Sequence, residues 1–137
     1  MPQNQSICIV DDDEVYKFFV KKILKIKNLA EDVLTFPDGE VAYNFIEQNK
    51  ENIEKLPDII FLDINMPIMD GFQFMDEYTK LKTQILKKIT IYMITSSIDP
   101  VDLERSKKYT EITDFISKPI TAEVLQRIIK IPNPNLI

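Results

Sequence analysis

Short apolar runs that alternate with longer amphipathic segments are the feature of this sequence that most constrains its fold. The runs ICIV (7–10), IIFLD (59–63) and ITIYMI (89–94) are almost continuously apolar, without a polar residue at every second position. Strands of this kind are buried on both faces, as they are in a parallel sheet that is covered by helices. The sequence therefore predicts an α/β fold built on a parallel sheet.

Two more strand-like segments and five helical patterns complete the series. The additional strands are expected at 33–36 and 114–117, and the helices at 13–27, 41–49, 72–82, 99–109 and 121–130. Apolar residues at helical spacing mark the first helix and the last. They are Val15, Phe19, Ile23 and Ile26 in the first, and Val124, Leu125, Ile128 and Ile129 in the last.

Five strands that alternate with five helices predict a doubly wound, flavodoxin-like sheet with helices on both faces, because crossovers between parallel strands are right-handed. The strand order 2-1-3-4-5 is adopted from known flavodoxin-like folds and does not come from the pattern itself. A length of 137 residues fits one domain. We expect a single domain over 1–137, with a core at about 6–130, the last helix ended by Pro132 and Pro134, and no effector domain.

Composition excludes several classes of function. The 17 basic and 22 acidic residues give a net charge of −5, which disfavours nonspecific nucleic-acid binding. The chain has no histidine, so Ser-His-Asp catalysis and His-ligated zinc are excluded. It has no apolar run of about 18 residues for a membrane span and no signal peptide, so we expect a cytoplasmic protein. The one cysteine, Cys8, lies in an apolar strand and is interpreted as buried filler.

Polar residues follow the predicted strands at the points where those strands end. Asp11 and Asp12 follow the first strand, Asp63 ends the third, Thr95 follows the fourth and Lys118 follows the fifth. In this architecture ligands bind at the carboxyl ends of the strands, so these side chains are expected to converge. The carboxylates would repel one another unless a cation intervened, and oxygen ligands of this kind suit Mg²⁺.

Each of these residues also has an ordinary structural explanation. Asp-rich loops often cap helices, and Asp13 is expected to cap the first one. Taken alone, Asp11 and Asp12 fit a cap as well as a metal site, Thr95 fits a turn, and Lys118 fits an exposed surface. Their joint occurrence at the correct strand ends favours a functional site.

A carboxylate beside Mg²⁺, with a lysine and a hydroxyl in reach, is equipped for phosphoryl transfer. Asp63 can attack phosphorus as a nucleophile and become an aspartyl phosphate. Mg²⁺ and Lys118 would neutralise charge on the phosphoryl oxygens, and Thr95 could donate a hydrogen bond to one of them. The sequence contains neither GxxxxGK[ST] nor GxGxxG, so no nucleotide pocket is indicated.

Four motifs together resemble the receiver domain of bacterial two-component response regulators. They are IVDDDE, DIIFLDINMPIMDG, MITSS and DFISKPI, in that family's order and spacing over roughly residues 6–130. The resemblance implies that Asp63 is the phosphorylated residue and that Asp11 and Asp12 are the acid pair. It implies Mg²⁺ held by Asp12, Asp63 and the main-chain carbonyl of Asn65, with Asp11 acting through water.

The resemblance also implies a switch. Thr95 would be the switch hydroxyl, Lys118 would contact the phosphate, and the Lys118–Pro119 bond would be cis. Phe115 lies where the family has its switch aromatic residue. Phosphorylation would remodel the face formed by the fourth helix, the fifth strand and the fifth helix.

The function that follows is that of a stand-alone response regulator, not an enzyme beyond its own phosphorylation and dephosphorylation. The phosphoryl donor would be a phosphohistidine on a histidine kinase or a histidine phosphotransfer protein. The output would be an unknown downstream protein, with the chain a monomer or a phosphorylation-dependent dimer and with no nucleic-acid or membrane partner.

Two other interpretations stay open at this point. One is a phosphorylation-independent adaptor with a receiver fold, which the intact set of site residues disfavours. The other is a hydrolase with an aspartyl nucleophile, which needs a second aspartate where Asn65 stands.

Overall fold

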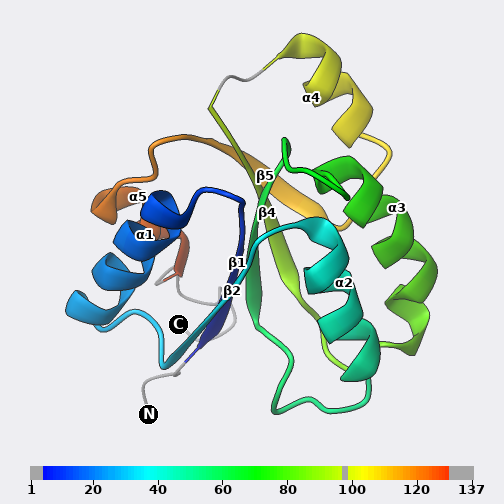
Figure 1. Cartoon of the computed structure of the whole chain (residues 1–137), viewed down its shortest axis with the longest axis horizontal. Helices are drawn as coiled ribbons and strands as arrows, with labels where there is room; N and C mark the ends of the chain where they lie inside the picture. Colours follow the sequence, from blue (N-terminus) through cyan, green and yellow to red (C-terminus); the bar gives the residue numbers. More distant parts are fainter. Residues whose placement is uncertain (1–4, 97–98, 130–137) are drawn as a thin grey trace, which may run out of the picture.

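The computed structural model describes residues 5–96 and 99–129, which form a three-layer α/β fold around one parallel sheet (Figure 1). The sheet has five strands in the order β2-β1-β3-β4-β5, and every neighbouring pair is parallel. The strands are β1 (Ser6–Val10), β2 (Asp32–Phe36), β3 (Ile59–Asp63), β4 (Thr90–Thr95) and β5 (Ile112–Ser117). The predicted fold class and strand order are confirmed.

Four α-helices connect the strands, a fifth follows β5, and a 3₁₀ turn (Lys82–Gln84) follows the third helix. They are α1 (Glu14–Ile26), α2 (Gly39–Gln48), α3 (Gly71–Leu81), α4 (Pro100–Ser106) and α5 (Ala122–Ile129). In Figure 1, α1 and α5 lie together on one side of the sheet and α2 and α3 on the other. None of the helices that the structure describes is both long enough and apolar enough to cross a membrane.

The central strands carry the core on both of their faces. Strand β3 is buried throughout, and β1 and β4 are buried except for their first residues, as their continuous apolar runs predict. Successive residues point to opposite sides. Ile7 and Ile9 pack with α1 and α5, whereas Cys8 and Val10 pack with α2 and α3. Burial raises the pKa of the Cys8 thiol, which agrees with its interpretation as buried filler.

Aspartate side chains cap the amino ends of four helices. The Asp13 carboxylate accepts a hydrogen bond from the Tyr16 amide at 3.0 Å, so the predicted cap of the first helix is confirmed. Asp38 and Asp99 cap α2 and α4 in the same way. Asp70 forms a reciprocal capping box with Gln73 at the start of α3. These caps set where the loops after the strands end.

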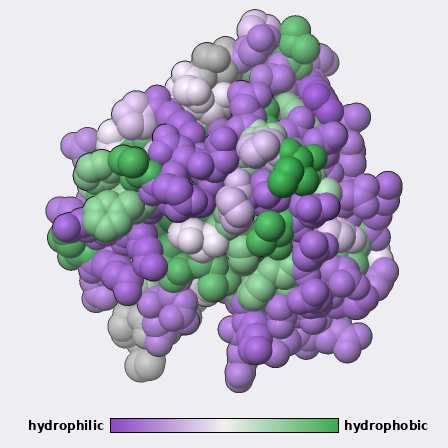
Figure 2. Space-filling view, in the orientation of Figure 1, coloured by the Kyte–Doolittle hydropathy of each residue, from purple (hydrophilic) through white to green (hydrophobic). Residues whose placement is uncertain are grey.

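The prediction of which face of α1 is buried is wrong. Val15, Phe19 and Ile26 are mostly exposed, at 65%, 58% and 69%, while the side chains that enter the core are Val20 and Leu24. Of the predicted set, only Ile23 packs against the core. Apolar residues lie on more than one face of this helix, so several of them stay exposed. Figure 2 shows green side chains among hydrophilic ones on the left of the molecule, where α1 lies.

A pair of alanine substitutions tests this orientation of α1. Leu24→Ala removes a fully buried side chain and should lower the free energy of unfolding by about 2–4 kcal/mol. Phe19→Ala truncates a larger but mostly exposed side chain and should change it by about 0.5 kcal/mol. Urea unfolding followed by circular dichroism measures both. The reverse ranking would support the face predicted from the sequence.

The fourth helix is shorter than the predicted segment 99–109. It ends at Ser106, and beyond it Tyr109 turns toward α3, where its hydroxyl donates to Asp76 and its ring stacks on Phe72. Arg105 lies over the same Phe72 ring, 4.4 Å from its centroid. These contacts with α3 replace the last predicted helical turn. The predicted end of the last helix at residue 130, with Pro132 and Pro134, lies outside the described residues.

Candidate phosphoacceptor site

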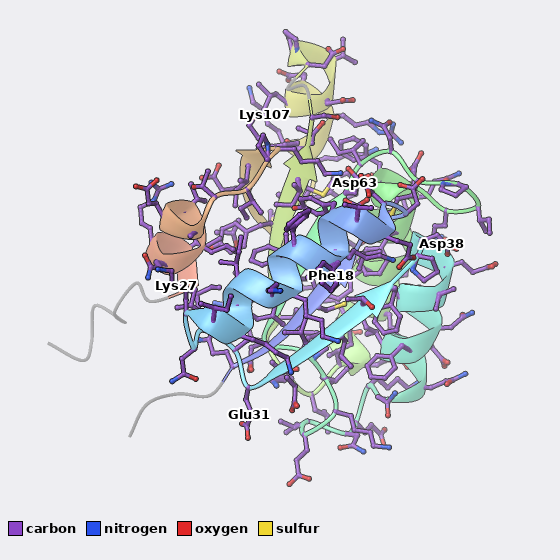
Figure 3. All side chains as sticks on the ribbon, turned by 60° about the vertical axis from the view of Figure 1, so that its left-hand side comes forward. Phe18, Lys27, Glu31, Asp38, Asp63 and Lys107 are labelled. Carbon is purple, nitrogen blue, oxygen red and sulfur yellow. The ribbon has the colours of Figure 1, made fainter. Side chains whose placement is uncertain are left out.

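Three carboxylates meet at the carboxyl ends of β1 and β3. Asp11 is buried, its amide donates to the carbonyl of Phe36 at 3.0 Å, and its Oδ1 accepts from the amide of Asp13 at 2.8 Å. Asp63 is the buried last residue of β3, and Asp12 is exposed. One carboxylate oxygen from each of Asp11, Asp12 and Asp63 lies within 4.8 Å of the others. Figure 3 shows Asp63 beside the beginning of α1, with Lys27 at the far end of that helix.

Lys118 reaches this acidic cluster from the end of β5. Its Nζ lies 2.7 Å from Asp11 Oδ2 and 3.8 Å from Asp63 Oδ1. Its amide donates to the carbonyl of Thr95 at 2.8 Å, so the loop after β5 is tied to the end of β4. The Lys118–Pro119 peptide bond is cis, as the resemblance implies.

The electrostatics of the cluster show an excess of negative charge. Burial and the neighbouring Asp11 carboxylate raise the pKa of Asp63 to about 6, although Lys118 acts in the opposite direction. Burial would lower the pKa of Lys118, but its contacts with Asp11 and Asp63 outweigh this and raise it. One ammonium therefore only partly balances three carboxylates, and an all-oxygen donor set of this kind fits a hard divalent cation such as Mg²⁺.

The other predicted site residues lie around the same edge of the sheet. Thr95 is the buried last residue of β4 and pairs in register with Ser117 of β5. Asn65 is exposed in the loop that follows Asp63. Phe115 is half-buried on β5, pairs with Met93 and packs against the core on the α2 and α3 side. The structure thus places these three residues on elements that border the acidic cluster.

Tyr16 lies at the site although the sequence did not predict it there. The Nζ atom of Lys118 lies over the Tyr16 ring, 4.4 Å from its centroid. Burial raises the pKa of the Tyr16 hydroxyl, and the negative charges of Asp11 and Asp63 add to this effect. The one sequence signal was its place three residues after the cap Asp13, and helical spacing alone does not point a ring at a lysine 102 residues away.

The sequence of this chain matches the model of a known protein family. The model of the response regulator receiver domain family matches residues 7–130. Among curated proteins, a sensor histidine kinase CheAY of Helicobacter pylori is 28% identical over 129 residues, which are 94% of this chain. The chain spans only 15% of the length of that kinase.

Solved structures share the fold. A two-component response regulator from Cytophaga hutchinsonii has a TM-score of 0.81 and 25% identity, with 93% of this chain and 96% of that chain covered. The receiver domain of the sensor histidine kinase PA1611 from Pseudomonas aeruginosa has a TM-score of 0.74 and 23% identity, with 93% and 96% covered. The latter structure has a magnesium ion coordinated in its active site cleft.

Proposed function

This chain belongs to the family of response regulator receiver domains, and from that premise we propose that Asp63 accepts a phosphoryl group from a phosphohistidine. The observation that carries the proposal is the position of Asp63: a buried carboxylate at a strand end, within 4.8 Å of the oxygens of Asp11 and Asp12 and beside the Lys118 ammonium. The carboxylate of Asp63 is a nucleophile, and the ammonium of Lys118 can neutralise the charge of a phosphoryl group, as phosphoryl transfer needs.

The proposed transfer of the phosphoryl group needs no general acid or base from this chain. A carboxylate oxygen of Asp63 forms a bond to phosphorus as the phosphorus–nitrogen bond of the donor breaks. The electron pair of that bond stays on the imidazole of the donor, which takes up a proton from solvent. Lys118 orients the oxygens of the phosphoryl group, and Thr95 donates a hydrogen bond to one of them.

Mg²⁺ is the cofactor that this arrangement fits. We assign Asp12, Asp63 and the main-chain carbonyl of Asn65 as the groups that would hold it, with Asp11 acting through water. When bound, the ion supplies neutralisation of charge on the phosphoryl oxygens. Clustered carboxylates and the family's acidic magnesium site support the assignment, as does the magnesium in the PA1611 receiver.

The output would be a shift between two conformers. Phosphorylation adds charge and acceptor oxygens beside Thr95, which would move toward the phosphate and leave space for the ring of Phe115. The affected face comprises α4, β5 and α5. Among the residues of α4, only Ser106 is buried, so this helix is held by few core contacts.

Partners follow from the same chemistry. The donor would be a histidine kinase or a histidine phosphotransfer protein, because these proteins carry the phosphohistidine that the proposed transfer requires. The receiving partner would be another protein, or a second copy of this chain, that binds the phosphorylated α4–β5–α5 face.

The test is phosphorylation with acetyl phosphate and Mg²⁺, followed by intact-mass spectrometry. The native protein should gain the mass of one phosphoryl group, and Asp63→Asn should gain none. Asp32→Asn is the matched control, because Asp32 is exposed at the amino end of β2, at the opposite edge of the sheet. It should gain the same mass as the native protein. A native protein that gains no mass would count against the proposed function.

A further inference from the structure

Tyr16 occupies a fixed position beside the acidic cluster. It is the third residue of α1, and its amide is bound by the Asp13 cap at 3.0 Å. One and two turns further along, Val20 and Leu24 anchor the same face of the helix in the core. The ring of Tyr16 packs against that core as well, so its orientation is set from both sides.

A hydrogen bond of the hydroxyl does not account for the position of Tyr16 at the site. Its oxygen atom is buried and has no hydrogen-bond partner among the residues that the structure describes. A buried phenol that donates nothing gains no stability from its polar end. What the site uses is therefore the face of the ring.

That face covers one side of the Lys118 ammonium. The distance of 4.4 Å from Nζ to the ring centroid is well inside the roughly 6 Å range of a cation–π interaction. Asp11 Oδ2 lies 2.7 Å from the same Nζ. A lysine side chain has a flexible four-carbon stem, so two contacts on its charged end restrict it far more than an ion pair alone.

We propose that Tyr16 is a positioning residue whose ring face holds the Lys118 ammonium against Asp11, within reach of a phosphoryl group on Asp63. The inference rests on the proposed function of Asp63 and adds a residue to that site. Without the ring, the ammonium would rotate toward solvent, and phosphorylation would slow although the carboxylates stayed in place.

The test varies the electron density of the ring while its shape is kept. Residue 16 is replaced by phenylalanine and by its mono-, di- and trifluorinated analogues, and phosphorylation by acetyl phosphate with Mg²⁺ is followed for each. Fluorine withdraws electron density from the ring face and weakens attraction of a cation. Tyr16→Phe should retain the native rate constant, and each fluorine should lower it, to about a tenfold loss in the trifluorinated protein.

Controls separate this role from packing. The same series at Phe18, whose ring meets Lys22 at 5.6 Å on the exposed side of α1, should leave the rate constant unchanged. Tyr16→Leu should be at least as slow as the trifluorinated protein. Equal rate constants across the residue 16 series, in a native protein that does become phosphorylated, would overturn the role of Tyr16 alone. A native protein that takes up no phosphoryl group would overturn the proposed function together with it.

Discussion

In the absence of metal, Asp63→Asn should make the protein more stable at pH 7, by about 1–2 kcal/mol in the free energy of unfolding. Burial and the Asp11 carboxylate raise the pKa of Asp63 from 3.8 to about 6. Between these two values the folded state binds more protons than the unfolded state, so the free energy of unfolding falls as pH rises from 4 to 6. Above pH 6 Asp63 is ionised in the folded state, and its buried charge lowers the free energy of unfolding by the full amount. A neutral asparagine at this position carries no such charge.

Two further measurements define this effect. At pH 4 Asp63 is protonated in the folded state, so the native protein and Asp63→Asn should have nearly equal free energies of unfolding. At pH 7, Mg²⁺ at about 100 times its dissociation constant should add about 2.7 kcal/mol to the native protein and much less to the variant. Urea unfolding at both pH values, with and without Mg²⁺, measures each quantity. Equal stability of the two metal-free proteins at pH 7 would contradict this account of the site.

Gly71→Ala should lower the free energy of unfolding by about 2–4 kcal/mol and slow the phosphorylation of Asp63. A methyl group on residue 71 would lie 2.5 Å from the carbonyl oxygen of Asp63 and 3.0 Å from the Cα atom of Ile64. Both are backbone atoms, one in the last residue of β3, the proposed acceptor, and one in the residue that follows it. The amide of Gly71 also donates to the carbonyl of Ile64 at 2.8 Å. The start of α3 must therefore move away from the end of β3.

Gln73→Ala is the control for Gly71→Ala. It lies two residues further along α3 and removes one half of the capping box, a loss worth about 1 kcal/mol, without a new contact to the loop after Asp63. Alanine also favours a helix over glycine by about 1 kcal/mol, which opposes the clash at residue 71. Thermal unfolding and the acetyl phosphate assay measure both variants. A smaller loss of stability in Gly71→Ala than in Gln73→Ala would show that the loop adapts easily.

The sheet could be predicted because its central strands are apolar without interruption. Burial on both faces leaves few alternatives to a parallel sheet, and the segments 59–63 and 114–117 fall within β3 and β5. The strand order came from known folds of this type, since pairing partners are not encoded in the composition of a strand. The end of α4 could not be predicted, because it depends on contacts of Tyr109 with residues of α3.

The face of α1 illustrates what periodicity cannot decide. Val15 and Phe19 are spaced like Val20 and Leu24, so two helical faces of this segment carry apolar residues at the same interval. The structure buries the second set, and it also buries Lys17, whose ammonium reaches Glu14 at 2.9 Å. A lysine on the buried face is unfavourable in a simple apolar pattern, but its long stem lets the charge find a partner.

The candidate site also contains residues that the sequence predicts and one that it does not. The convergence of Asp11, Asp12 and Asp63 follows from the rule that parallel strands end at one edge of the sheet, and the structure brings these carboxylates together. The contact between Tyr16 and Lys118 depends on the rotation of α1 about its axis, which the pattern assigned incorrectly. The residues at strand ends can therefore be predicted from the sequence, whereas the one on a helix face cannot.

The central claim, that Asp63 is the phosphoacceptor, is tested most directly by reductive trapping. Borohydride converts an aspartyl phosphate into homoserine, which peptide mass spectrometry locates in the sequence. After incubation with acetyl phosphate and Mg²⁺, homoserine should replace aspartate at position 63 and at no other position. Homoserine at another aspartate, or none in a protein that has gained a phosphoryl group, would contradict the claim.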